Sequence, residues 1–267
     1  MVIGAGPVGL AVATGLRRRG VPVCVLESGP EIASSVSEFN DGDVTGLPFT
    51  GILQRGRGLG GGTSQWAGQC IRFHAADFEA RDWVNESGWP LGYDDLVPFY
   101  SEAEQFFDVN SDGYLARVWR DFGLEPGGLV DTDVLVRFSV FARDPQVFDR
   151  DRRRWERDRD GWLIYNSTVT AFTRDGSRID GLEVKGPNGK TLTFGCDVVV
   201  LCVGGIETAR TMLQPMADFP NGLGGGNPHV GRHLQDHPNL LLGRIEEFSP
   251  GQGLGNVTKY LSTFYRR

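Results

Sequence analysis

In the first thirty residues, the spacing of the hydrophobic residues changes twice, from a continuous apolar run to a helical spacing and back to a continuous run. An apolar start at residues 1–3 leads into glycines, and apolar residues at helical spacing follow from Leu10 to Arg19. Gly20 ends that segment, and a second apolar run, Val21 to Leu26, ends in Glu27. This order predicts strand, turn, helix and strand. Buried strands usually have about five or six residues, so the first strand is short.

The turn before this helix reads Gly4-Ala5-Gly6-Pro7-Val8-Gly9, the spacing of a dinucleotide-binding fingerprint in its required context. Gly4 permits the tight turn, and Gly6 lets a pyrophosphate approach the amides at the positive end of the helix. Gly9 allows close packing of the helix on the strand. We therefore expect Gly4, Gly6, Pro7, Val8 and Gly9 to lie at a bound cofactor.

Glu27 stands eighteen residues after Gly9, at the end of the second predicted strand. A carboxylate there accepts hydrogen bonds from ribose hydroxyls in dinucleotide-binding folds. The alternative is that Glu27 is only a solvated strand end. We count Glu27 and its neighbour Ser28 as cofactor-binding residues.

A second glycine-rich stretch runs from Arg57 to Gly68 and contains Gly60-Gly61-Gly62-Thr63-Ser64. Because glycine has no Cβ, such a backbone can lie flat against a large planar ligand. A flexible surface turn is the alternative interpretation. The residues that we expect at the ligand are Arg57, Gly61, Gly62, Thr63, Ser64, Ala67 and Gly68.

Further along, the pattern predicts one helix and several strands. Asp94 or Asp95 caps a helix that runs to Phe107, with a broad apolar face that includes Val97 and Phe99. Short alternating runs then predict a small antiparallel meander. Its strands are 163–165, 168–172, 179–184 and 191–194, with a turn at 186–189.

The run from Asp197 to Val203 is continuously apolar, as in a strand buried on both faces of a parallel sheet. It leads into Gly204-Gly205, a second strand-to-helix glycine turn. The helix that follows is predicted to reach about Leu213, before Pro215.

Composition narrows the function classes. The chain has 267 residues and a formal net charge of −7, so no field attracts nucleic acid. No apolar run approaches the roughly 20 residues of a membrane span, and no signal peptide is visible, so we expect a cytoplasmic protein. The four cysteines lack metal-site spacing, and we expect free thiols.

Three histidines four residues apart, His229, His233 and His237, would share one face of a helix and suggest a metal site. Proline and glycine at Pro228 and Gly231 argue against an uninterrupted helix. We therefore predict no metal site.

Several motifs together resemble the N-terminal half of the glucose-methanol-choline oxidoreductases. They are the fingerprint, the Gly-Gly-Gly-Thr-Ser-x-Trp loop, the Ser87-to-Leu96 segment (Ser-Gly-Trp-Pro-Leu-Gly-Tyr-Asp-Asp-Leu), the Gly204-Gly205 turn and the Val230-to-Pro238 segment (Val-Gly-Arg-x-Leu-x-Asp-His-Pro). The likeness is greatest to the branch with pyranose oxidase and the sugar and glycoside dehydrogenases. It implies a Rossmann-like α/β FAD-binding domain, with a parallel sheet, helices and an inserted antiparallel meander, followed by the beginning of a substrate-binding domain. The expected division is residues 1–75 with 160–237 for FAD, an inserted partly helical region at 76–159, and the start of a truncated second domain at 238–267.

The resemblance also implies chemistry: FAD takes a hydride at N5 from the CH–OH group of a sugar, glycoside or other alcohol. It nominates Val169 as an adenine contact and Gly204 and Gly205 as contacts near the pyrophosphate and ribityl chain. Gln65 stands where a histidine can bond covalently to flavin, so we predict non-covalent FAD. The family's C-terminal catalytic histidine has no match here. We therefore name no catalytic residue and expect a portion of a longer gene. The electron acceptor is not specified.

Two other hypotheses stay open. An NAD(P)-dependent reductase uses the same fingerprint but does not need the second glycine stretch. An inactive or partner-completed fragment of a flavoenzyme is the non-enzymatic alternative.

Overall fold

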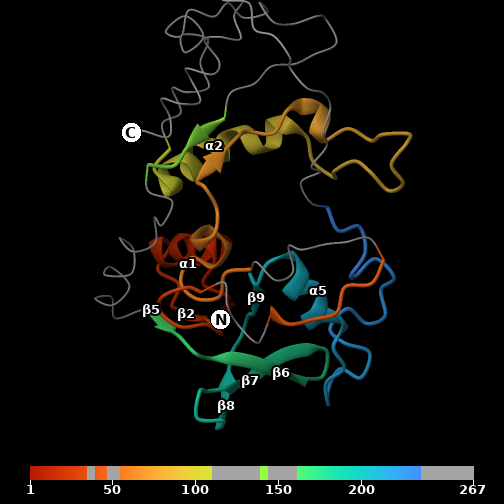
Figure 1. Ribbon diagram of the computed structural model, residues 1–267. Coiled ribbons are helices and arrows are strands. Elements are labelled where there is room, and N and C mark those ends of the chain that lie inside the picture. Colours follow the sequence, from red (N-terminus) through yellow and green to blue (C-terminus); the bar gives the residue numbers. More distant parts are fainter. Residues whose placement is uncertain (35–39, 47–54, 110–138, 144–160, 236–267) are drawn as a thin grey trace, which may run out of the picture. The chain divides into compact units, whose positions relative to one another are not determined.

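The computed structural model describes residues 1–34, 40–46, 55–109, 139–143 and 161–235 (Figure 1). The chain divides into two units. The first comprises residues 1–67 and 144–235, and the second comprises residues 68–143 and 236–267. The predicted second-domain start at 238–267, and most of the predicted insertion beyond residue 109, lie outside the described residues.

A parallel sheet forms the centre of the first unit, with the strand order β5-β2-β1-β9. Helix α1 connects β1 to β2, and all three strand pairs are parallel. This β-α-β unit is the Rossmann-like core that the sequence predicts, and the predicted fold class is confirmed. The elements are β1 (Val2–Ile3), α1 (Pro7–Arg18), β2 (Val23–Leu26), β5 (Gly161–Ile164), β9 (Val200–Leu201) and α5 (Gly205–Leu213).

Helix α1 begins earlier than its apolar pattern predicts. Its N-cap is Gly6 and its first residue is Pro7, whose fixed φ suits the first helical position. Leu10 and Ala13 are buried against the sheet, while Arg17 and Arg18 stand in the last turn, where cations complement the helix dipole.

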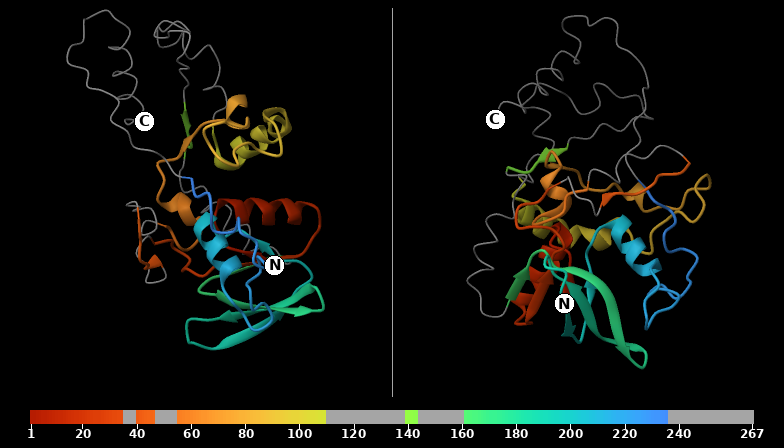
Figure 2. Two further views of the ribbon diagram at one scale, coloured as in Figure 1. Left: turned by 90° about the vertical axis from the view of Figure 1, so that its right-hand side faces the viewer. Right: turned by 60° about the horizontal axis from the view of Figure 1, so that its bottom comes forward.

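The antiparallel meander is a separate three-stranded sheet, with β7 in the middle (Figure 2). Its strands are β6 (Thr168–Asp175), β7 (Arg178–Lys185) and β8 (Thr191–Gly195). One face packs on the parallel sheet, and the shared hydrophobic cluster contains Ile3, Leu26, Phe172, Leu182 and Val184. The meander is therefore part of the core of the first unit.

Two strand predictions are wrong in detail. Leu163 and Ile164 belong to β5, which pairs in parallel with β2, and not to the meander. The strand predicted over 197–203 is only the half-buried β9, and Val198 is 65% exposed. Strand β9 pairs with β1, which offers two residues, so the ladder stops where its partner stops.

The second unit contains the pair β3 (Gln69–Cys70) and β4 (Val140–Phe141) and helix α2 (Tyr93–Phe107). Helix α2 starts after Gly92, and the Asp95 carboxylate accepts the Gly92 N–H at 2.8 Å. Asp95 therefore acts from the third helical position and is not the N-cap. The predicted apolar face is largely exposed, since Val97 is 44% and Phe99 59% accessible.

Glu104 is the buried residue of α2, and its carboxylate pairs with Arg72 through a 2.7 Å hydrogen bond from Nε. Aromatic rings gather in the same unit around Phe78, which lies edge-on to Phe73 with ring centroids 5.6 Å apart. No helix in the described ranges is long and apolar enough to cross a membrane.

Leu182 provides a test of the meander's place in the core, because its side chain is 0% exposed. We expect Leu182→Ala to lower the free energy of unfolding by about 2–5 kcal/mol, through lost burial and the cavity left behind. Leu192→Ala, on the neighbouring strand and 63% exposed, is the matched control and should change it by less than about 0.5 kcal/mol. Urea denaturation measures both, and equal effects would contradict the assignment.

Candidate functional site

A cavity of about 670 Å³ lies within the first unit, at the ends of β1, β2 and β9 where α1 and α5 begin. This size is typical of small-molecule and cofactor sites. Most of the residues predicted at the cofactor line it. They are Gly4, Gly6, Pro7, Val8, Glu27, Ser28, Arg57, Gly61, Gly62, Val169, Gly204 and Gly205.

Two fingerprint glycines are required by the packing of the protein itself. Gly4 has φ +99°, and a Cβ there would overlap the Cys202 carbonyl group. A Cβ on Gly9 would overlap the carbonyl oxygen of Gly4. Gly9 accordingly lies under the loop and not in the cavity wall, as its predicted packing role requires.

Other glycines face open space. Ideal Cβ atoms at Gly6, Gly62, Gly204 and Gly205 would meet no protein atom within 4 Å, and all four residues line the cavity. Gly6 and Gly204 are the N-caps of α1 and α5, and neither helix has a side-chain cap. Two helix starts therefore present backbone amides to one cavity, which suits an anionic ligand with a close backbone approach.

Glu27 is 6% exposed, so it is not a solvated strand end. Its Oε2 accepts the Ala5 N–H at 2.8 Å, and its Oε1 accepts the N–H groups of Gly29 at 2.8 Å and Gly58 at 3.0 Å. A carboxylate has about four lone-pair sites. Glu27 thus ties the fingerprint loop to the 55–58 segment, and the ribose contact expected from its position stays a prediction.

The second glycine stretch forms a short 3-10 turn, η2 (Gly61–Ser64), that follows Gly60 in the left-handed region at φ +83°. The Gly60 N–H donates to the Ala5 carbonyl at 2.8 Å, which fixes this turn to the fingerprint loop. The hydroxyl groups of Thr63 and Ser64 donate hydrogen bonds to the backbone carbonyls of Gly60 and Gly61, respectively. Their side chains do not line the cavity, and neither do Ala67 and Gly68.

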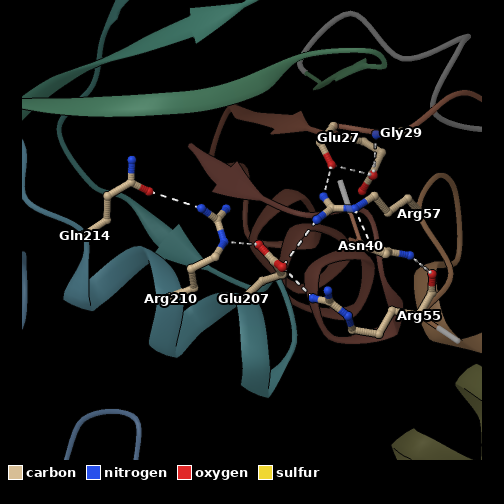
Figure 3. Close-up of polar contacts among 9 residues, drawn as sticks. Glu27, Gly29, Asn40, Arg55, Arg57, Glu207, Arg210 and Gln214 are labelled. Atoms are coloured by element: carbon tan, nitrogen blue, oxygen red, sulfur yellow. Dashed lines mark hydrogen bonds and ion pairs between the residues drawn. The ribbon is translucent and has the colours of Figure 1, made fainter. Parts of the chain in front are cut away.

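An ionic cluster that the sequence did not predict lies in the same wall (Figure 3). Glu207, on α5, pairs with Arg55, with Arg57 at 3.3 Å and with Arg210 at 2.8 Å. Arg57 also donates from Nε to Asn40 Oδ1 and from Nη1 to Ser28 Oγ, both at 2.9 Å. The guanidinium of Arg57 is therefore held from three sides.

The cluster shifts two pKa values. Burial lowers the pKa of Arg57, although the charge of Glu207 acts in the opposite direction. Burial by itself raises the pKa of Glu207, but hydrogen bonds from Arg55 and Arg210 outweigh it, and the net pKa lies below its usual value. Glu207 is therefore ionised at neutral pH.

Val169 lies in the wall on β6, where the pairing with β7 shifts register between Val169 and Ala171. Such bulges change the direction of neighbouring side chains and are frequent beside functional sites. Ser167 and Thr168 line the cavity beside it. The adenine contact expected of Val169 stays a prediction.

Most of the chain matches a known protein family. The family model of the FAD-dependent oxidoreductases, described as "FAD dependent oxidoreductase", matches residues 1–222. The chain belongs to this family. The FAD-dependent oxidoreductase recognised in the motifs is confirmed at this level, and FAD is the family's cofactor. No curated protein matches the chain in sequence.

Solved structures share the fold at low identity. Pyridoxine 4-oxidase from Mesorbium loti has a TM-score of 0.50 at 20% identity, over 78% of this chain and 50% of that one. A formate oxidase has a TM-score of 0.54 at 16% identity, over 79% of this chain and 46% of that one. The chain thus spans about half the length of these structures.

Gly6, which faces the open cavity, and Gly9, which packs against the protein, provide a direct test of this FAD site. We expect Gly6→Ala to weaken FAD binding about tenfold or more, because the new Cβ points into the cavity, while the free energy of unfolding changes by less than about 1 kcal/mol. Gly9→Ala should instead lower that free energy by about 3 kcal/mol through overlap with Gly4. FAD titration and urea denaturation of both variants measure this. Equal loss of stability in both would contradict the distinction.

Glu207 gives a pH-dependent prediction. Because its folded pKa is lowered, its contribution to stability is present above the unfolded pKa, about 4.3, and is lost as pH falls through the folded value. We expect Glu207→Gln to cost about 2 kcal/mol at pH 7 and progressively less below about pH 4. Asp175→Asn, an exposed carboxylate of the same unit, is the control. Unfolding free energies from pH 3 to 7 that differ by a constant amount would refute the linkage.

Proposed function

We propose that this chain is the FAD-binding part of an oxidoreductase that acts on CH–OH groups of sugars, glycosides or other alcohols. The proposal rests mainly on one observation: the two glycine-rich segments of the chain lie next to each other in the wall of one cavity. The fingerprint loop at Gly6 and the second glycine stretch at Gly61–Gly62 meet there, with a Cβ on Gly61 only 3.1 Å from the Gly6 Cα. A nucleotide-binding turn and a flat backbone next to it fit a flavin dinucleotide.

FAD, when bound, supplies the acceptor for a hydride at its N5. The residues of this chain provide the binding surface, through helix-start amides for the phosphates and Cβ-free backbone for close approach. No histidine of the described residues lines the cavity. His74 caps the 3-10 turn η3 (Ala75–Asp77) in the second unit, and His229 and His233 stack on each other with centroids 6.1 Å apart. We therefore assign no base.

The proposed substrate class rests on the motif resemblance and on the names of two structurally similar enzymes. Pyridoxine 4-oxidase and formate oxidase are both named as oxidases of small molecules. This supports a small-molecule substrate, and the sugar or glycoside class comes from the motifs. An NAD(P)-dependent reductase is less well supported, because it has no need for the second glycine element.

The test is the visible absorption spectrum of the purified chain, before and after addition of FAD and after gel filtration. We expect flavin bands that persist through the column. Acid precipitation should release the flavin, because Gln65 cannot form the covalent bond. Tighter binding of NADH than of FAD would favour the reductase. Flavin that stays with the precipitate would contradict non-covalent binding.

A further inference from the structure

The cavity wall carries more positive than negative charge, although the whole chain has a net charge of −7. Within the part of the chain that the structure describes, its charged residues are Arg55, Arg57, Arg210, Glu27 and Glu207. Three arginines against two glutamates leave a formal charge of +1, and the amide ends of α1 and α5 add partial positive charge. The site is thus a positive region in an acidic protein.

The arginines are fixed before any ligand arrives. Glu207 pairs with all three, and Arg57 is further held by Asn40 and Ser28. The side chains of Arg55 and Arg57 are only 21% and 15% exposed. Ordering long cationic side chains costs conformational entropy. Because these side chains are already ordered in the folded protein, less conformational entropy is lost when a ligand binds.

The charge balance also favours an anion. Glu207 is shared by three guanidinium groups, and burial disfavours the charge of Arg57, although the charges of Glu207 and Glu27 favour it. An arriving phosphate would restore the balance, and arginine is the side chain best suited to phosphate because its planar donors match the oxygens.

We propose that Arg55, Arg57 and Arg210, positioned by Glu207, form a phosphate-recognition wall for the diphosphate of the bound dinucleotide. This inference rests on the proposed FAD site and adds a side-chain contribution to the two helix starts. Arg57 is its central residue, because it joins Glu207 to Ser28 and Asn40. The arginines favour ligands that carry a negatively charged phosphate, whereas the glycines favour ligands whose shape allows close approach to the backbone.

The competing explanation is that the cluster only shapes the 55–58 segment. The two explanations differ in ligand and salt dependence. A structural arginine affects all ligands alike, whereas a phosphate-binding one affects ADP and FAD but not uncharged riboflavin. Only the phosphate-binding role makes affinity fall with added salt through that arginine, because salt screens charge interactions.

The experiment measures the Kd of FAD, ADP and riboflavin for the full chain and for Arg57→Gln, at low and high salt. We expect FAD and ADP to bind about tenfold to a hundredfold more weakly to the variant, with a reduced salt dependence and unchanged riboflavin binding. Arg57→Lys keeps the charge and should retain the salt dependence with an intermediate Kd. Arg178→Gln removes a 67% exposed arginine outside the cavity and should match wild type.

ADP and FAD affinities unchanged in Arg57→Gln would overturn the inference, and so would an equal loss for riboflavin with the wild-type salt dependence. Failure of the wild-type chain to bind FAD would instead overturn the proposed function. Urea midpoints of each variant identify loss of folding. If Arg57→Gln does not fold, Arg210→Gln, at the 58% exposed edge of the cluster, must show the reduced salt dependence or the inference fails.

Discussion

One buried carboxylate holds together the segments that build the cofactor cavity. Glu27 accepts backbone N–H groups from Ala5 in the fingerprint loop, from Gly29 in its own turn and from Gly58 at the second glycine stretch. These donors come from three places in the sequence and would be unsatisfied in the protein interior without it. A residue that motif spacing assigns to the ligand is therefore also the link between the two ligand-binding loops.

Glu207 has a parallel role from the other side of the same segment. It holds Arg55 and Arg57 through side chains, while Glu27 holds Gly58 through the backbone. The 55–58 segment is thus fixed at both ends by acidic residues from different places in the fold: Glu27 directly follows β2, and Glu207 belongs to α5. Because the Gly60–Gly62 turn follows directly, its position against Gly6 depends on both carboxylates.

The sequence predicted the parts of this site that depend on local signals. The strand, turn, helix and strand of the fingerprint follow from periodicity and glycine spacing within thirty residues. The pairing of β5 with β2 was missed because a strand's sheet partner is not encoded in its own apolar pattern. Asn40 and Arg55 come from a polar stretch without periodicity, so no signal marked them. The pairing of Glu207 with Arg210 could have been predicted, because their i,i+3 spacing places both on one face of a predicted helix.

The cavity wall also shows what this part of the chain does not supply. Among the described residues of that wall, Glu27 is bonded to three amides, Glu207 is held ionised by arginines, and burial raises the pKa of the Cys202 thiol. Each is committed to the structure or poorly suited to accept a proton from an alcohol. In the proposed reaction, the described wall binds and orients the flavin dinucleotide, and the proton acceptor has to come from residues outside it. Binding and proton transfer are separated here because Glu207 is engaged with arginines and Glu27 with backbone amides.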